Sequence, residues 1–188
     1  MSSAMKLSNE PESILKRFEM VFLNESRECV FLKPVGKLTV GDKTVGPFKK
    51  GDRTFLQNWV IEKLLNGGLV EIIPAHFHES LRRLQNLYRE EEKQRQLQDF
   101  NPSLYAAIGR RLLSLQSDKT SMDPRRFDEI EKLQRMVPLL VETRLSKILR
   151  IAKANAFRDK KSQMSHEEQW LCEQLAHLLA GWRQYIIG

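Results

Sequence analysis

The chain has 188 residues, of which 41% are hydrophobic and 29% are charged, a balance typical of globular proteins and not of disordered ones. Its 31 Lys and Arg residues exceed its 24 Asp and Glu residues, and the formal charge of +7 favours polyanionic partners without identifying one. The two cysteines lie far apart and indicate neither a disulfide framework nor a zinc knuckle. No window has the pattern of a signal peptide or a membrane span, so we expect no membrane contact.

The first part of the sequence predicts a small β-rich domain at residues 1–75. A capped helical turn at residues 8–17 comes first. Three short apolar segments then alternate with turn residues and are predicted as strands, at residues 20–23, 29–32 and 38–40.

A short helix is predicted between a turn and a strand in the same domain. Gly46-Pro47 ends the extended chain, and Asp52 or Thr54 can accept hydrogen bonds from the first helical amides. The apolar residues at helical spacing are Phe55, Trp59 and Leu64. Gly67-Gly68 then stops the helix, and a strand at residues 69–73 follows.

The remaining residues, 76–188, predict a larger all-helical domain, so the expected fold class is α+β. Apolar spacing predicts helices at residues 77–88 and 103–115. Between them, the charged stretch at residues 89–100 has little to bury, and we interpret it as a solvated helix end or a tether.

A long helix is predicted from Asp123-Pro124 to about residue 159, because Asp caps free amides and Pro suits the first helical position. Pro138 lies inside this pattern and lacks an amide donor, so we expect a kink or a split there.

Ser165 and Glu168 have the spacing of a capping box and begin the last predicted helix. The apolar surface of this helix is wider than the stripe of about 100° that packing within one domain requires. We therefore expect it to contact a second protein, and complete burial inside this chain stays open as the alternative. The expected subunit-interface residues are Leu171, Leu175, Leu178, Trp182, Tyr185 and Ile186.

No pattern in the sequence predicts catalysis. The glycines lack the spacing and the lysine of a phosphate-binding loop, while His76 and His78 stand on different faces of a helix without further ligands. Cys29 falls in a predicted strand and Cys172 on an apolar helix, where burial raises a thiol pKa. We therefore expect no enzyme, no metal and no cofactor.

Basic residues occur in pairs that suit phosphate contacts without base recognition, so any DNA affinity should be weak, independent of sequence and sensitive to salt. Over residues 1–80, 11 basic residues nearly balance 10 acidic ones, which assigns the positive excess to the helical part. The candidate nucleic-acid contacts are Lys49, Lys50, Arg110, Arg111, Arg125 and Arg126.

The order of five segments resembles a subunit of GINS, a complex of the replication fork. The segments are VGPFKKG, LQNWVIEKLLNGGLVEIIP, REEEKQ, FNPSLYAAIGRRLL and ETRLSKILRIA. The resemblance runs from about Leu32 to the C-terminus. The small domain precedes the helical one, an order similar to the subunit class that eukaryotes divide into two paralogues and archaea typically keep as one.

The resemblance implies a non-catalytic scaffold that links the MCM helicase to a RecJ-like partner and supports helicase activity. The first implied partner is a second GINS subunit type, in a 2:2 heterotetramer. Primase or polymerase is a further implied partner. Arg144 and Lys147 match a family position for basic residues and are expected to act in helix packing or an ion pair. The implied location is the archaeal cytoplasm, near the nucleoid, or the nucleus of a eukaryote.

A different hypothesis is a basic DNA-binding regulator, in which residues 45–73 form part of a winged module and the helical part dimerises. Tight, sequence-specific binding at physiological salt would distinguish it, because affinity from phosphate contacts alone is largely lost there. The predicted helix at residues 54–66 contains only one basic residue, Lys63, which does not favour a recognition helix.

Overall fold

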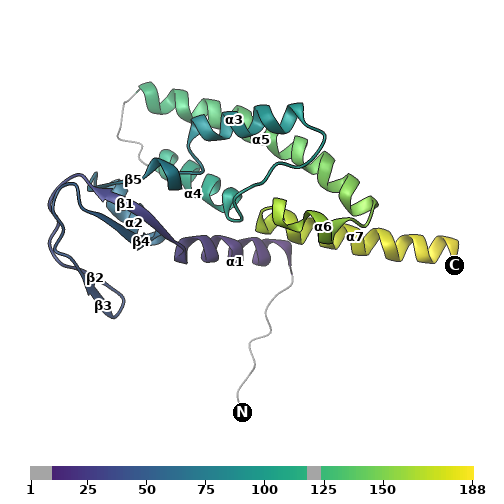
Figure 1. Cartoon of the computed structure of the whole chain (residues 1–188), viewed down its shortest axis with the longest axis horizontal. Helices are drawn as coiled ribbons and strands as arrows, with labels where there is room; N and C mark the ends of the chain where they lie inside the picture. The colour runs from purple at the N-terminus through teal and green to yellow at the C-terminus, as the bar shows by residue number, and fades with distance from the viewer. Residues whose placement is uncertain (1–9, 118–123) are drawn as a thin grey trace, which may run out of the picture. The chain divides into compact units, whose positions relative to one another are not determined.

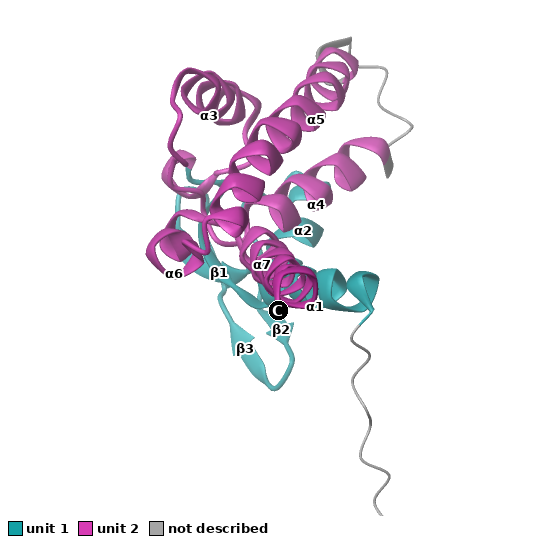
Figure 2. Cartoon of the chain, turned by 90° about the vertical axis from the view of Figure 1, so that its right-hand side faces the viewer, with its two compact units in different colours: residues 1–73 teal, residues 74–188 magenta. Residues whose placement is uncertain are grey.

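The structure, a computed structural model, describes residues 10–117 and 124–188, without the side chains of 117 and 124–126. The chain divides into two compact units, residues 1–73 and 74–188 (Figure 2). The first is a small β-rich unit with two helices, and the second is a larger helical unit, so the predicted α+β fold class is confirmed.

The first unit is built on a three-stranded antiparallel sheet with the strand order β4-β1-β5 (Figure 1). Its strands are β1 (Ser26–Phe31), β4 (Arg53–Gln57) and β5 (Val70–Ile72). Helix α1 (Pro11–Asn24) leads into β1, and helix α2 (Asn58–Asn66) joins β4 to β5. Two further strands, β2 (Leu38–Val40) and β3 (Lys43–Val45), pair only with each other.

Residues 26–57 form one long hairpin. The pairs Val30–Arg53, Val35–Phe48 and Leu38–Val45 follow a single register from the sheet to the turn after Val40. The ring of Phe48 stacks on Phe31 with 4.2 Å between centroids, which fixes the base of the distal part against the sheet. The part of the hairpin that contains β2 and β3 therefore extends away from β1, β4 and α2 (Figure 1).

The core of this unit joins the sheet to both helices. Cys29 and Phe31 of β1 are buried with Ile61 of α2 and Val70 of β5. Asn58, fully buried at the start of α2, donates a 2.7 Å hydrogen bond to the Phe22 carbonyl at the end of α1 and accepts one from Arg27. Burying this amide is tolerated because its hydrogen bonds are made.

Two predictions for this unit are wrong. Residues 20–23 belong to α1 and not to a strand, because Phe22 is buried on the inner side of a helix that begins with Pro11. Residues 53–57 form β4, so α2 begins only at Asn58 and is preceded by Gln57, not capped by Asp52 or Thr54. Pairing with β1 takes up the backbone of this segment, a long-range contact that local spacing does not report.

The helical unit is organised around one central helix, α5 (Pro124–Lys153), which contacts the other four helices of the unit. These are α3 (Leu81–Lys93), α4 (Leu104–Ser117), the short α6 (Phe157–Lys160) and α7 (His166–Ile187). Single 3-10 turns at Pro74–His76 and Lys161–Gln163 complete the unit. Ser165 and Glu168 form the predicted capping box at the start of α7.

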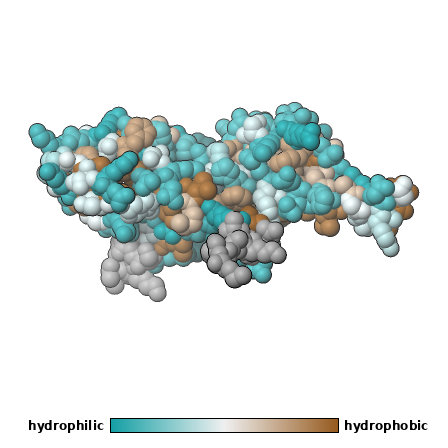
Figure 3. Space-filling model, turned by 90° about the horizontal axis from the view of Figure 1, so that it is seen from below, coloured by the Kyte–Doolittle hydropathy of each residue, from teal (hydrophilic) through white to brown (hydrophobic). Residues whose placement is uncertain are grey.

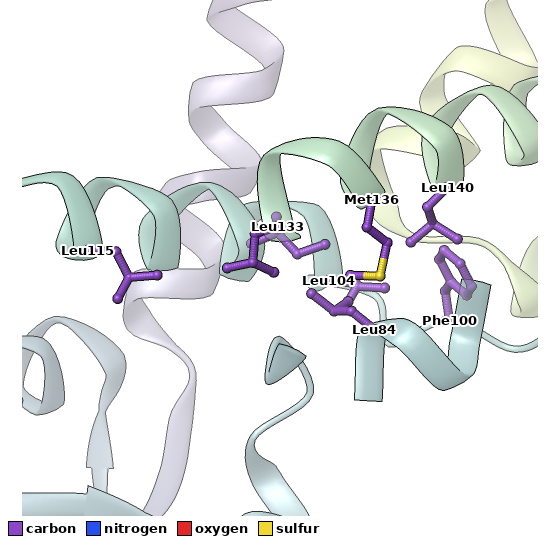
Figure 4. Packing of buried hydrophobic residues seen from close by; sticks show 8 residues of the cluster. Leu84, Phe100, Leu104, Leu115, Leu133, Met136 and Leu140 are labelled. Carbon is purple, nitrogen blue, oxygen red and sulfur yellow. The ribbon is translucent and has the colours of Figure 1, made fainter. Parts of the chain in front are cut away.

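Two apolar clusters hold the bundle together. The first is formed by α3, α4, α5 and the segment before α4, and its buried residues include Leu84, Phe100, Leu104, Leu115, Leu133, Met136 and Leu140 (Figure 4). The second lies where α5 meets α7, and its buried residues are Leu97, Ile148, Ala152, Met164 and Cys172.

Helix α5 runs without a break through Pro138, so the predicted split of the helix is wrong. Pro138 removes the hydrogen bond that the carbonyl of Gln134 would normally accept. Both residues lie on an exposed face of α5, where water can reach that carbonyl. The lost bond therefore need not end the helix.

Candidate functional site: a buried ion cluster and the apolar end of the last helix

The helical unit buries two cations and two carboxylates in one cluster. Arg144 belongs to α5, and its side chain is fully buried in the bundle. It donates to both carboxylate oxygens of Glu168 in α7, at 2.8 and 2.6 Å, and to Glu91 in α3 at 3.2 Å. Its remaining donors bind the carbonyls of Gln98 and Gln163, at 2.9 and 3.0 Å. All five guanidinium N–H groups are thus satisfied, which burial of this charge requires.

Lys147, one turn further along α5, completes the charge balance. Its ammonium group donates to a carboxylate oxygen of Glu91 and to the Glu91 carbonyl, both at 2.6 Å, and to the Gln96 carbonyl at 3.0 Å. The carbonyls lie at and just beyond the C-terminal end of α3, where the helix dipole also stabilises a cation. Glu91 therefore stands between Arg144 and Lys147 and neutralises part of each charge.

The segment at residues 94–103 is tied into this cluster. The backbone N–H of Gln98 donates to Glu91 at 3.0 Å, and the guanidinium of Arg144 lies 3.8 Å from the centroid of the Phe100 ring. Leu97 is buried in the second core cluster. The interpretation of residues 89–100 as a solvated end or tether is therefore wrong for the buried Glu91, Leu97 and Phe100, whereas most of the other residues of the stretch are exposed. Charge density alone predicts exposure, but Glu91 has its buried partners 53 and 56 residues away.

The surroundings of Arg144 favour its charged form. Burial opposes the charge of Arg144, but its hydrogen bond to Glu168 and the Glu168 charge outweigh that cost, so the pKa of Arg144 is raised. Tyr105 donates to Glu168 at 2.8 Å, and burial, followed by the Glu168 charge, raises the pKa of its hydroxyl far above the usual range. No donor of Arg144 or Lys147 is left for a ligand, so the cluster fixes α3, α5 and α7 and does not form an open site.

Sequence reasoning singled out Arg144 and Lys147 but missed their partners. Glu168 is predicted only as a capping residue, and it serves both functions: its carboxylate accepts from the Ser165 amide at 3.1 Å and from Arg144. Glu91 has no local signal at all, because it is one of three consecutive glutamates and only the fold selects it.

The C-terminal half of α7 carries the exposed apolar surface of this unit. Leu171 and Leu175 are half-buried, and Leu175 packs on the second core cluster. Beyond them the exposed fractions rise to 67% for Leu178 and 60% for Trp182. Tyr185, Ile186 and Ile187 are exposed as well, and hydrophobic residues are visible among hydrophilic ones at the right-hand tip of the view in Figure 3. We call the exposed residues Leu178, Trp182, Tyr185, Ile186 and Ile187 the α7 apolar end.

The predicted nucleic-acid contacts are divided between the two units. Lys49 and Lys50 are exposed in the hairpin of the first unit. Arg110 and Arg111 are half-buried in α4, and Arg111 is engaged by Glu129 at 2.9 Å and by the Phe77 ring. Arg125 and Arg126 begin α5, and their side chains lie outside the described residues. In α2, the ammonium group of Lys63 lies over Trp59, so no observation favours a recognition helix.

Both cysteines of the chain are buried. Burial raises the pKa of Cys29 and of Cys172 to about 11, which keeps both thiols protonated and unreactive. Among residues 10–117 and 124–188, no three His, Cys, Asp or Glu side chains gather in a way that could hold a metal ion. None of the described helices combines the length and hydrophobicity needed to cross a bilayer.

Comparison with known proteins identifies the helical unit. The family model described as "Sld5: GINS complex protein helical bundle domain" matches residues 79–187, which is more than half of the chain. A search of curated proteins finds no match. The match covers the ion cluster and the α7 apolar end, and it agrees with the resemblance in the order of the sequence segments. The chain therefore belongs to the GINS family, whose members are subunits of a complex in DNA replication.

Proposed function

We propose that this chain is a non-catalytic scaffold subunit that assembles with a second, helix-first GINS subunit through the α7 apolar end. The observation that carries the proposal is the set of large apolar side chains left exposed at the end of a helix within the family-matched region. Exposed apolar side chains that gather at one end of a helix are typical of protein interfaces. In the full proposal the complex is a 2:2 heterotetramer.

A partner that covers the α7 apolar end would remove large apolar side chains from water. Complete burial of a large apolar side chain contributes about 1.5–3 kcal/mol. Trp182 and Leu178 are each at least 60% exposed and stand four residues apart, so they share one face of α7. An aromatic residue in such a position is a common energetic centre of an interface. We expect Trp182 and Leu178 to contribute most to assembly, with Tyr185 and Ile186 beside them.

The ion cluster holds α7, the helix that carries this interface, against α5. Arg144 and Glu168 fix the first turn of α7 to the middle of α5, and Arg183 donates to the Lys153 carbonyl at 3.1 Å further along the helix. These contacts set the direction in which the C-terminal half of α7 leaves the bundle. We propose that Arg144 and Lys147 act in this way, by positioning helices and not by contacting a substrate.

At the fork, the assembled complex would link the MCM helicase to a RecJ-like protein and support unwinding, with primase or polymerase as further partners. The resemblance in segment order and the family match support this role. The same resemblance supports an archaeal source and a location at the nucleoid, or in the nucleus if the source is eukaryotic.

Co-expression with the cognate helix-first subunit tests the assembly. Leu178→Asp and Trp182→Asp should each prevent co-purification, because the partner would bury an unpaired charge. Gln184→Asp is the matched control, since it adds the same charge at an exposed position of α7 that lies two residues from Trp182, on a different face of the helix, and it should leave assembly intact. Unchanged co-purification of both apolar variants, or equal loss in the control, would refute the proposed interface.

A further inference from the structure

A strong charge separation exists inside the first unit. Residues 33–53, which we call the basic ribbon, contain six basic and two acidic residues, a net charge of +4. The rest of the described unit, residues 10–32 and 54–73, contains four basic and seven acidic residues, a net charge of −3. The near balance over residues 1–80 therefore hides two oppositely charged parts.

The cations of the basic ribbon all point to solvent. The six residues are exposed, and among the described residues none of them has an ion-pair partner: Lys33, Lys37, Lys43, Lys49, Lys50 and Arg53. Of the two acids, Asp52 uses a carboxylate oxygen to accept the Lys49 amide at 2.7 Å, which shapes the turn at the base of the ribbon. A concentrated positive potential on an extended hairpin is thus left uncompensated.

We propose that the basic ribbon is a binding surface for the phosphate backbone of duplex DNA. The inference goes beyond the assembly role proposed above and does not depend on it. A two-stranded β-ribbon is narrow enough to enter the major groove, which is about 12 Å wide. Exposed hydroxyls of Thr39 and Thr44, paired near the tip, add donors of the kind that contact phosphates.

The ribbon is suited to phosphates and not to bases. Its only aromatic residue, Phe48, is stacked on Phe31 and cannot serve as a platform for an unpaired base. It has no Asn or Gln that could pair with adenine, so direct base contacts would be mainly those of its cations with guanine, and phosphate contacts should dominate. An acidic protein segment is a less suitable partner, because the larger apolar side chains of the ribbon, Leu38, Val40 and Val45, are half-buried and offer little apolar contact.

The test measures binding of the 188-residue chain to a labelled duplex and to a single strand of the same length, by fluorescence anisotropy over a range of salt. Each neutralised phosphate steepens the dependence of log K on log salt by about 0.9. Replacing Lys33, Lys37 and Lys43 by Gln should therefore make the slope for the duplex shallower by up to about 2.7. Replacing Arg150, Lys153 and Arg158, exposed cations of the helical unit, gives the matched control and should leave the slope unchanged.

Several results would overturn the proposal. Absence of duplex binding at about 50 mM salt would do so, as would an equal loss in the ribbon and control variants. Tighter binding to the single strand than to the duplex would reject the groove assignment. Ribbon-dependent binding of a poly-glutamate peptide without binding of DNA would assign the surface to an acidic protein instead. Circular dichroism of both triple variants confirms that the comparison is made between folded proteins.

Discussion

Removing one cation from the buried cluster should be among the most destabilising single changes in the helical unit. In Arg144→Met the carboxylate of Glu168 loses both hydrogen bonds from the guanidinium while it stays about 3% exposed. Glu91 keeps Lys147 and is less affected. Because loss of one partner leaves a buried charge uncompensated, we expect a destabilisation of about 3–5 kcal/mol.

The chain supplies a matched control on the same helix. Arg135 pairs with Glu131 on α5, but both side chains are more than 60% exposed. Arg135→Met should therefore change the free energy of unfolding by less than about 1 kcal/mol. Urea unfolding followed by far-ultraviolet circular dichroism gives both values, since urea does not screen charges and the helical unit dominates the signal.

A second substitution distinguishes electrostatics from packing. Glu168→Gln removes the uncompensated charge and keeps an amide that can serve in the capping box. The double variant with Arg144→Met should be more stable than Arg144→Met alone, which identifies the stranded carboxylate as the cause. If Arg144→Met and Arg135→Met prove equally mild, or if Glu168→Gln brings no recovery of stability, then Arg144 does not stabilise the bundle by compensating the buried charge of Glu168.

Three further predictions follow from single residues. Ser165→Ala should lower the free energy of unfolding by about 1 kcal/mol through loss of the α7 cap, measured in urea, and an unchanged midpoint would contradict it. Cys29 and Cys172, with pKa values of about 11, should resist iodoacetamide at pH 8 until the chain is unfolded, and rapid native alkylation would refute their burial. Burial raises the pKa of Glu167, so its folded form binds a proton more tightly than its unfolded form, and its charge destabilises the fold at neutral pH. Glu167→Gln should therefore stabilise the chain at pH 7 and lose that advantage as the pH falls below the ordinary Glu pKa, as thermal melts at both pH values would show.

The sequence predicts the elements that depend on interactions between residues close together in the chain. The capping box needs only Ser165 and Glu168 at the right spacing, and α7 begins where that spacing predicts. The helix after residue 103 and the strands near residues 29–32 and 38–40 likewise follow from short-range patterns. The large apolar side chains of the α7 apolar end are likewise evident from the sequence of one helix, and they are exposed, while their contact with a partner stays a prediction.

The errors share a long-range cause. Phe55 fits a helical spacing with Trp59, but pairing of β4 with β1 places it in a strand. Glu91 reads as a solvated charge, but the bundle closes over it and supplies Arg144 and Lys147 from a helix more than 50 residues away. The charge of the basic ribbon was hidden because a count over residues 1–80 averages the positive hairpin with the net negative charge of the flanking residues 10–32 and 54–73.

The most direct test of the account is the native mass of the chain co-expressed with a helix-first GINS subunit. We expect a stable complex that contains this 22.0 kDa chain together with its partner, and we expect that complex to be lost in Trp182→Asp but not in Gln184→Asp. A lone, well-behaved 22.0 kDa monomer in the presence of that partner would contradict it.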